Sequence, residues 1–244
     1  DMTFSAPKSV SVMWALSDAG KRPRIEQAQR AAVMAATTHL QNTAAWARRG
    51  KGGAIREPTA GLLMAAFEHH TSRALDPQLH THVFIFNLAP RKDGTWGAIV
   101  SRELYKAQKQ AGAVYREALA AALERDGHAL ERSVNGFRVA AVPRDVERAF
   151  SKRRQSIEAA AEVHGYRSAK GMELAALRTR EAKRDVRRDV LFETWRAEAR
   201  ALGFELNTAA EARRILVSAN GRNTSGEMQS ARRATSQPAL ESKE

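Results

Sequence analysis

The alternation of apolar and polar positions predicts several strands. The chain opens with a short alternating segment, and two longer apolar segments follow the first quarter of the chain. Val83 to Phe86 is apolar at every position, which is typical of a central strand covered on both faces. Asn135-Gly136 between two short apolar runs is a strong signal for a hairpin turn. We expect strands at residues 1–5, 62–71, 79–88, 130–133 and 137–142.

A spacing of three to four residues between apolar positions predicts helices elsewhere. We expect them at residues 9–16, 25–49, 101–110 and 112–125. The pattern from 143 to 202 is also helical, with breaks near Gly165 and Gly171. Residues 218–244 are rich in Ser, Asn, Gly, Thr and Gln, so we expect a disordered tail there.

Charge and composition narrow the possible functions of this 244-residue chain. It carries 40 Lys and Arg against 27 Asp and Glu, a net charge of +13, which favours a polyanionic partner. Nucleic acid fits better than a membrane surface, because no long basic helix has an aromatic apolar face. The alternative to a polyanionic partner is that the charge belongs to a solvated, Arg-rich helical surface. The absence of cysteine excludes disulfides, iron–sulfur clusters and thiol nucleophiles. With no apolar run near the ~20 residues of a membrane span and no signal-peptide pattern, we expect a cytoplasmic protein without membrane insertion.

A group of histidines is the most informative local feature. His80 and His82 are two positions apart, so on a strand both imidazoles lie on one face. A loop at residues 73–78 would return the chain so that His69 or His70 lies opposite them. Three nitrogen ligands with open positions are typical of catalytic sites for Zn, Mn, Ni or Cu rather than Ca. The alternative is a polar strand edge, and alternation alone does not choose between His69 and His70.

Three strings carry a resemblance to a known family. They are DMTFSAPKSVS at 1–11, then His69 with TSR at 71–73, DPQLHTH at 76–82 and Asn87, and finally GAVY at 112–115. In order and approximate spacing they resemble the relaxase domain of conjugative plasmids, of the TrwC/TraI (MobF) type. The similarity extends from residue 1 to about residue 205.

The resemblance implies an α+β fold. An antiparallel sheet flanked by helices, the palm of relaxases and HUH endonucleases, would occupy residues 1–142 and carry the metal site. A helical region at 143–217 would close over DNA, and 218–244 would be the disordered tail.

The resemblance also implies an activity. The family nicks one strand at a plasmid transfer origin when a tyrosine attacks the scissile phosphate, and it later rejoins the strand. A divalent ion (Mg, Mn or Zn) would be held by His69, His80 and His82, and Asp1 would orient a histidine and help to manage the tyrosine proton. Implied partners are single-stranded DNA, the transfer-origin hairpin, and other relaxosome and conjugation-coupling proteins in the bacterial cytoplasm.

Two basic residues are candidates for DNA contacts. Arg73 follows the histidine-bearing strand and could clamp a phosphate through two N–H groups; the alternative is a salt bridge with Asp76. Lys8, near a helix start, could contact DNA or be a solvated surface lysine.

The tyrosines depart from the family pattern. The family's nucleophiles precede the strand that begins here with Asp1, and none of Tyr105, Tyr115 and Tyr166 occupies that position. We therefore interpret the chain as a fragment with the metal site and the base but without the attacking group, and expect that it does not nick DNA alone. Two other functions are a non-catalytic single-stranded DNA-binding module of the same fold and a metal hydrolase unrelated to DNA. The hydrolase explains neither the charge nor the matching strings.

Overall fold

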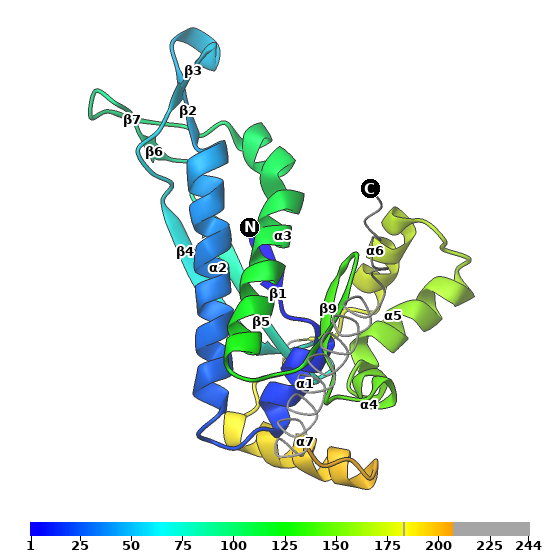
Figure 1. Cartoon of the computed structure of the whole chain (residues 1–244). Coiled ribbons are helices and arrows are strands. Elements are labelled where there is room, and N and C mark those ends of the chain that lie inside the picture. The colour runs from blue at the N-terminus through cyan, green and yellow to red at the C-terminus, as the bar shows by residue number, and fades with distance from the viewer. Residues whose placement is uncertain (183, 207–244) are drawn as a thin grey trace, which may run out of the picture. The chain divides into compact units, whose positions relative to one another are not determined.

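A three-stranded antiparallel sheet carries the histidines (Figure 1). The structure is a computed structural model that describes residues 1–182 and 184–206. The strands are β1 (Met2–Ser5), β4 (Met64–Thr71) and β5 (Pro77–Ile85), in the order β1-β5-β4. The three predicted strands are thus confirmed, as is an antiparallel sheet flanked by helices. The tail predicted at 218–244 lies outside the described residues.

The described residues also form three two-stranded ribbons. They are β2 (Trp46–Arg49) with β3 (Ile55–Pro58), β6 (Ala89–Pro90) with β7 (Trp96–Gly97), and β8 (Leu130–Ser133) with β9 (Gly136–Val139). The β8–β9 pair confirms the hairpin predicted at Asn135-Gly136. The helix predicted to reach residue 49 is wrong beyond Ala44. β2 pairs with β3 on one side, and on the other it exchanges backbone hydrogen bonds with Ala98 and Val100.

The helices confirm most of the predicted pattern. They are α1 (Lys8–Leu16), α2 (Arg22–Ala44), α3 (Ser101–Arg125), α4 (Arg144–Ala149), α5 (Lys152–Val163), α6 (Ala169–Arg178) and α7 (Arg188–Ala201), with a short 3-10 helix η1 (Lys51–Gly53). Gly165, at φ +66°, follows the end of α5 as expected. Gly112 and Gly171, however, lie inside α3 and α6. No helix of the described part is both long and apolar enough to cross a membrane.

The described residues between 179 and 187 are not helical, so the helix predicted there is wrong. Side chains from elsewhere bind the carbonyl groups that a continuing helix would use. Arg153 donates to the carbonyl oxygens of Ala176 and Thr179, and Arg73 donates to that of Glu181. These long-range hydrogen bonds favour an irregular segment after α6.

Helices α2 and α3 cover one face of the sheet (Figure 1). Phe4 of β1 packs against Tyr115 of α3 with ring centroids 5.4 Å apart, and Gln29 of α2 donates to the Phe4 carbonyl oxygen. On β5, Val83 faces the helices and is 1% exposed, whereas its neighbour Phe84 is 47% exposed. β5 is central, as predicted, but the expectation that both of its faces are covered is wrong. The face that carries Phe84 also carries His80 and His82.

Helices after residue 143 are tied to the loop between β4 and β5. The carboxylate of Asp76, 1% exposed, accepts hydrogen bonds from the Ser72 hydroxyl and the Arg153 backbone N–H. Burial raises the pKa of Asp76, and the nearby ammonium groups of Lys8 and Lys152 oppose that shift. Asp76 thus joins the loop to the start of α5. The division predicted at residue 143 stays a prediction.

Candidate metal centre

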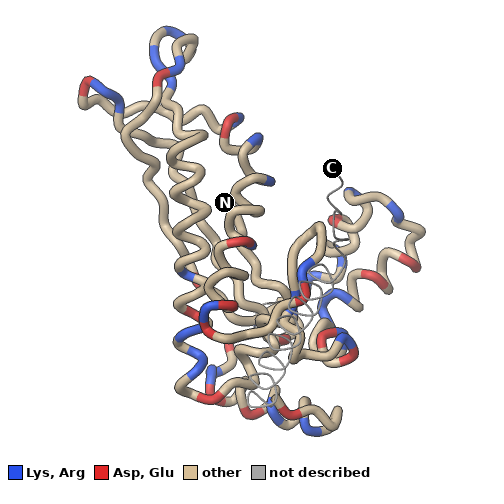
Figure 2. The backbone as a smooth tube through the Cα atoms, viewed as in Figure 1, with Lys and Arg blue, Asp and Glu red and all other residues tan. Residues whose placement is uncertain are grey.

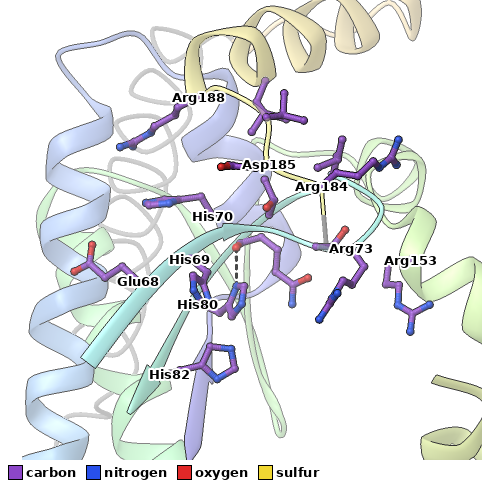
Figure 3. A pocket seen from close by; sticks show the side chains of 16 residues that line it. Glu68, His69, His70, Arg73, His80, His82, Arg153, Arg184, Asp185 and Arg188 are labelled. Carbon is purple, nitrogen blue, oxygen red and sulfur yellow. Dashed lines mark hydrogen bonds between the residues drawn. The ribbon is translucent and has the colours of Figure 1, made fainter. Parts of the chain in front are cut away.

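Three imidazoles converge on the face of the sheet opposite α2 and α3 (Figure 3). His69 of β4 lies directly across from His80 of β5, and His82 follows two positions later on the same face. Each ring centroid lies 5.1–5.2 Å from the other two. One nitrogen of each ring lies within 4.8 Å of the others, which is a spacing that a single metal ion can bridge.

Hydrogen bonds orient two of the three rings. Nδ1 of His80 lies 2.9 Å from the carbonyl oxygen of Gln78, so it donates its proton there and Nε2 keeps its lone pair. Nδ1 of His82 lies 2.9 Å from Oδ2 of Asp1 and 3.0 Å from Oγ1 of Thr3. A carboxylate or carbonyl behind an imidazole fixes its tautomer and raises its basicity as a ligand.

Burial also favours the neutral, ligating form of one histidine. It lowers the pKa of His80, because the protonated ring would lose solvation. A neutral imidazole is the form that binds a metal ion. The geometry of the site therefore fits a borderline divalent cation, with three nitrogen ligands and positions left for another molecule.

His70 is separated from this cluster. Its ring stacks on Trp14, with centroids 5.3 Å apart and planes 20° apart, and Figure 3 shows it directed away from the three other imidazoles. The geometry therefore selects His69 where the sequence left the two neighbours open. This choice follows from the register of β4 against β5, which places His69 directly across from His80.

The triad opens into a cavity of about 480 Å³ with a basic wall (Figure 3). The charged residues that line it are Glu68, Arg73, Arg153, Arg184, Asp185 and Arg188. Elsewhere on the molecule, Lys and Arg are distributed over most elements, including the loop between β2 and β3 (Figure 2). Four arginines against two carboxylates favour an anionic group in this cavity.

The two basic residues singled out in the sequence have different surroundings. Arg73 lines the cavity and uses one N–H of Nη1 on the Glu181 carbonyl oxygen, so its planar fork has further donors. The alternative salt bridge with Asp76 is not formed; that carboxylate is bound by Ser72 and Arg153. Lys8 is not a solvated surface lysine, because its half-buried Nζ donates to the Pro77 carbonyl oxygen at 2.9 Å. Burial lowers the pKa of Lys8.

None of the three tyrosines lines the cavity in the described part of the chain. Tyr115 is buried and donates to Oε1 of Gln29 at 2.6 Å, and burial raises its pKa. Tyr105 lies on α3 and is 75% exposed. Tyr166 stacks on His164 with centroids 5.4 Å apart. Each tyrosine thus has a setting other than the metal site.

Asp1→Ala is expected to weaken divalent metal binding by about 10- to 100-fold, the usual effect of removing a group that orients a ligating histidine. The structural reason is the 2.9 Å contact between Asp1 and His82. Titration with Mn²⁺ or Zn²⁺ by calorimetry measures it. Asp185→Ala is the matched control, since this carboxylate lines the same cavity. Equal affinities for the two variants would contradict an orienting role for Asp1.

Comparisons with known proteins agree with this geometry. The family model described as TrwC relaxase matches residues 1–202. The multifunctional conjugation protein TraI of Escherichia coli K12 is 33% identical in an alignment of 221 residues that covers 87% of this chain. The chain spans only 12% of the length of that relative.

Two solved structures are similar along most of the chain. One is the conjugative relaxase TrwC in complex with oriT DNA in a copper-bound form, 36% identical with a TM-score of 0.76, over 84% of this chain and 71% of that one. The other is a metal-free structure of TrwC with oriT DNA, 34% identical with a TM-score of 0.77, over 84% and 73% of the two chains. The range matched by the family model, residues 1–202, includes the three histidines.

Proposed function

The chain belongs to the TrwC relaxase family, and we propose on this basis that it is the metal-binding part of a conjugative relaxase. Such an enzyme nicks and rejoins one DNA strand at a plasmid transfer origin through a phosphotyrosine intermediate. The observation that carries the proposal is the convergence of His69, His80 and His82 within 4.8 Å beside a basic cavity. We place the protein in the bacterial cytoplasm.

The residues of the site have distinct roles in this proposal. His69, His80 and His82 hold one divalent ion, Mg²⁺, Mn²⁺ or Zn²⁺. When bound, the ion would neutralise charge on a phosphate oxygen and polarise phosphorus. Oδ2 of Asp1 accepts the Nδ1 proton of His82, which keeps that ring in the ligating tautomer. Arg73 binds a phosphate of the strand with its remaining N–H donors.

The partner in this proposal is single-stranded DNA next to the transfer-origin hairpin, with other relaxosome and conjugation-coupling proteins. The net charge of +13 and the arginines around the cavity support a polyanion. The relatives TrwC and TraI support the same assignment, because TrwC is described in complex with oriT DNA and TraI as a conjugation protein.

Binding of a single-stranded oligonucleotide is expected to weaken steeply with salt. Each phosphate met by Lys or Arg releases counterions, so log K falls with log salt by about 0.7 per contact on single strands. Fluorescence anisotropy at several salt concentrations measures the slope. Arg73→Ala should reduce this salt slope by the amount expected for about one phosphate contact. Arg144→Ala, which lies outside the cavity lining, should leave the slope unchanged. An affinity that stays constant with salt would instead favour a metal hydrolase unrelated to DNA.

No covalent adduct with DNA is expected to form on Tyr105, Tyr115 or Tyr166. Covalent catalysis needs a hydroxyl within reach of the scissile phosphate, and none of the three lines the cavity in the described part of the chain. The measurement is incubation with a transfer-origin oligonucleotide and Mn²⁺ or Mg²⁺, followed by a denaturing gel with and without protease. An adduct that is lost on Tyr105→Phe or Tyr166→Phe would contradict this prediction.

A second candidate function is a non-catalytic module that binds single-stranded DNA with the same fold. It is supported by the observation that none of the three tyrosines lines the cavity in the described part of the chain. The two functions differ in one measurement, the adduct assay on a protein extended by the codons that precede Asp1 in the gene. An adduct on a tyrosine of that extension supports the relaxase, and DNA binding without any adduct supports the module.

A further inference from the structure

Three exposed phenylalanines lie beside the triad on the same face of the sheet. Phe67 of β4 is 56% exposed, Phe84 of β5 is 47% exposed, and Phe86 just after β5 is 40% exposed. The rings of Phe84 and Phe86 meet edge to face, with centroids 5.1 Å apart. We call these three side chains the aromatic strip.

The strand register places the strip next to the metal ligands. Phe67 lies directly across from His82, which puts their Cβ atoms about 5 Å apart. Phe84 is the next residue on that face after His82, about 6.6 Å further along the strand. Phe84 is paired with Ala65, whose methyl group leaves the phenyl ring uncovered. The rings of Phe67 and Phe84 therefore lie within about the length of one nucleotide from the triad.

An exposed aromatic strip on a sheet face indicates a ligand-binding surface. The solvent face of an antiparallel sheet is ordinarily polar, and helices α2 and α3 pack on the opposite face through residues such as Val83 and Thr81. Three phenyl rings in water are unfavourable, and they provide no polar group for a phosphate. Their chemistry suits a planar apolar surface.

We propose that the aromatic strip is a platform on which nucleobases of single-stranded DNA stack while an adjacent phosphate lies at the triad. The inference rests on the proposed function, since it takes the strand as the ligand of the site. The cavity arginines adjoin the triad and meet phosphates, and the strip provides the bases with apolar faces. Stacking on phenyl rings is tolerant of sequence, so the strip holds the strand whatever its bases are.

The test compares two ligands, oligothymidylate and an abasic oligomer of the same length, with the wild type and with Phe67→Ala/Phe84→Ala. The wild type is expected to bind oligothymidylate about 5- to 100-fold more tightly than the abasic oligomer. The double variant should lose this preference and keep its affinity for the abasic oligomer and its salt slope. Phe67→Trp/Phe84→Trp should restore the preference. Tyr105→Ala, which removes an exposed aromatic ring on α3, should behave as the wild type.

The outcomes distinguish failure of the stacking platform from failure of the proposed function. Salt-dependent DNA binding with an unchanged preference in the double variant would overturn the platform and leave the proposed function standing. An equal loss for both oligomers would also overturn it, as would a wild-type dimer that the double variant turns into a monomer in sedimentation, because a second copy would then cover the strip. A wild type that binds no DNA at any salt concentration would overturn both.

Discussion

His80→Ala/His82→Ala is expected to reduce divalent metal binding from one ion per chain to none. Two of the three nitrogen ligands are removed, and the imidazole of His69 alone does not retain an ion through dialysis. Metal analysis after dialysis against Mn²⁺ or Zn²⁺ measures the stoichiometry. A second readout is thermal unfolding, since a ligand at 100 times its dissociation constant stabilises the folded state by about 2.7 kcal/mol. That stabilisation should disappear in the double variant and, for the wild type, after treatment with a chelator.

His70→Ala is the matched control for this experiment. Its ring stacks on Trp14 and is directed away from the triad, so one ion per chain should still bind. The cost should be to folding stability, because a half-buried ring is removed from its contact with Trp14. Full occupancy in the double variant, or loss of the ion in His70→Ala, would contradict the assignment of the ligands.

The histidine site shows how far local sequence reasoning extends. A period of two places His80 and His82 on one face wherever the segment is a strand. The choice between His69 and His70 needs the register between strands, and the pairing of β4 with β5 shifts between His69 and Thr71. Such an irregularity depends on the loop at 72–76, so alternation alone left two possibilities.

The two wrong helix predictions share one physical cause. Residues 46–49 continue a helical pattern, but their backbone is hydrogen-bonded to β3 and to residues 98 and 100, which are distant in sequence. The carbonyl group of Thr179 is bound by Arg153 in the same way. Local propensity is a weak preference, and contacts of this kind override it. The burial of Lys8 against Pro77 has the same origin, since nothing near Lys8 in the sequence indicates a partner.

The exposed phenylalanines illustrate the opposite case. An apolar run such as Val83 to Phe86 predicts a strand correctly, and the structure places β5 in the middle of the sheet. The same run does not say what covers each face. Because α2 and α3 lie on one side, Val83 is buried and Phe84 stays exposed beside the triad. The apolar run that predicted a covered strand thus includes Phe84, whose exposed side chain we assign to a ligand-binding surface.

Trp195→Ala is expected to lower the free energy of unfolding by about 3–5 kcal/mol, the range for removing a large buried aromatic ring. Trp195 of α7 is 1% exposed and packs against Trp14 and Phe192. Its indole N–H also donates to the carbonyl oxygen of Leu75 at 2.8 Å, in the loop that joins the two histidine-bearing strands. Leu75 has a φ of +60°, an uncommon conformation for a residue other than glycine, so this hydrogen bond helps to hold a strained loop.

Trp195→Phe separates the two contributions. It keeps most of the buried ring and leaves the Leu75 carbonyl group without its indole donor, which should cost about 1–3 kcal/mol. Urea unfolding followed by circular dichroism measures both variants against the wild type. Leu177→Ala, a change at a side chain 62% exposed on α6, should stay within about 0.5 kcal/mol. A loss below 1 kcal/mol for Trp195→Ala would show that α7 is not what fixes this loop, and the arrangement of the triad would then depend on the sheet alone.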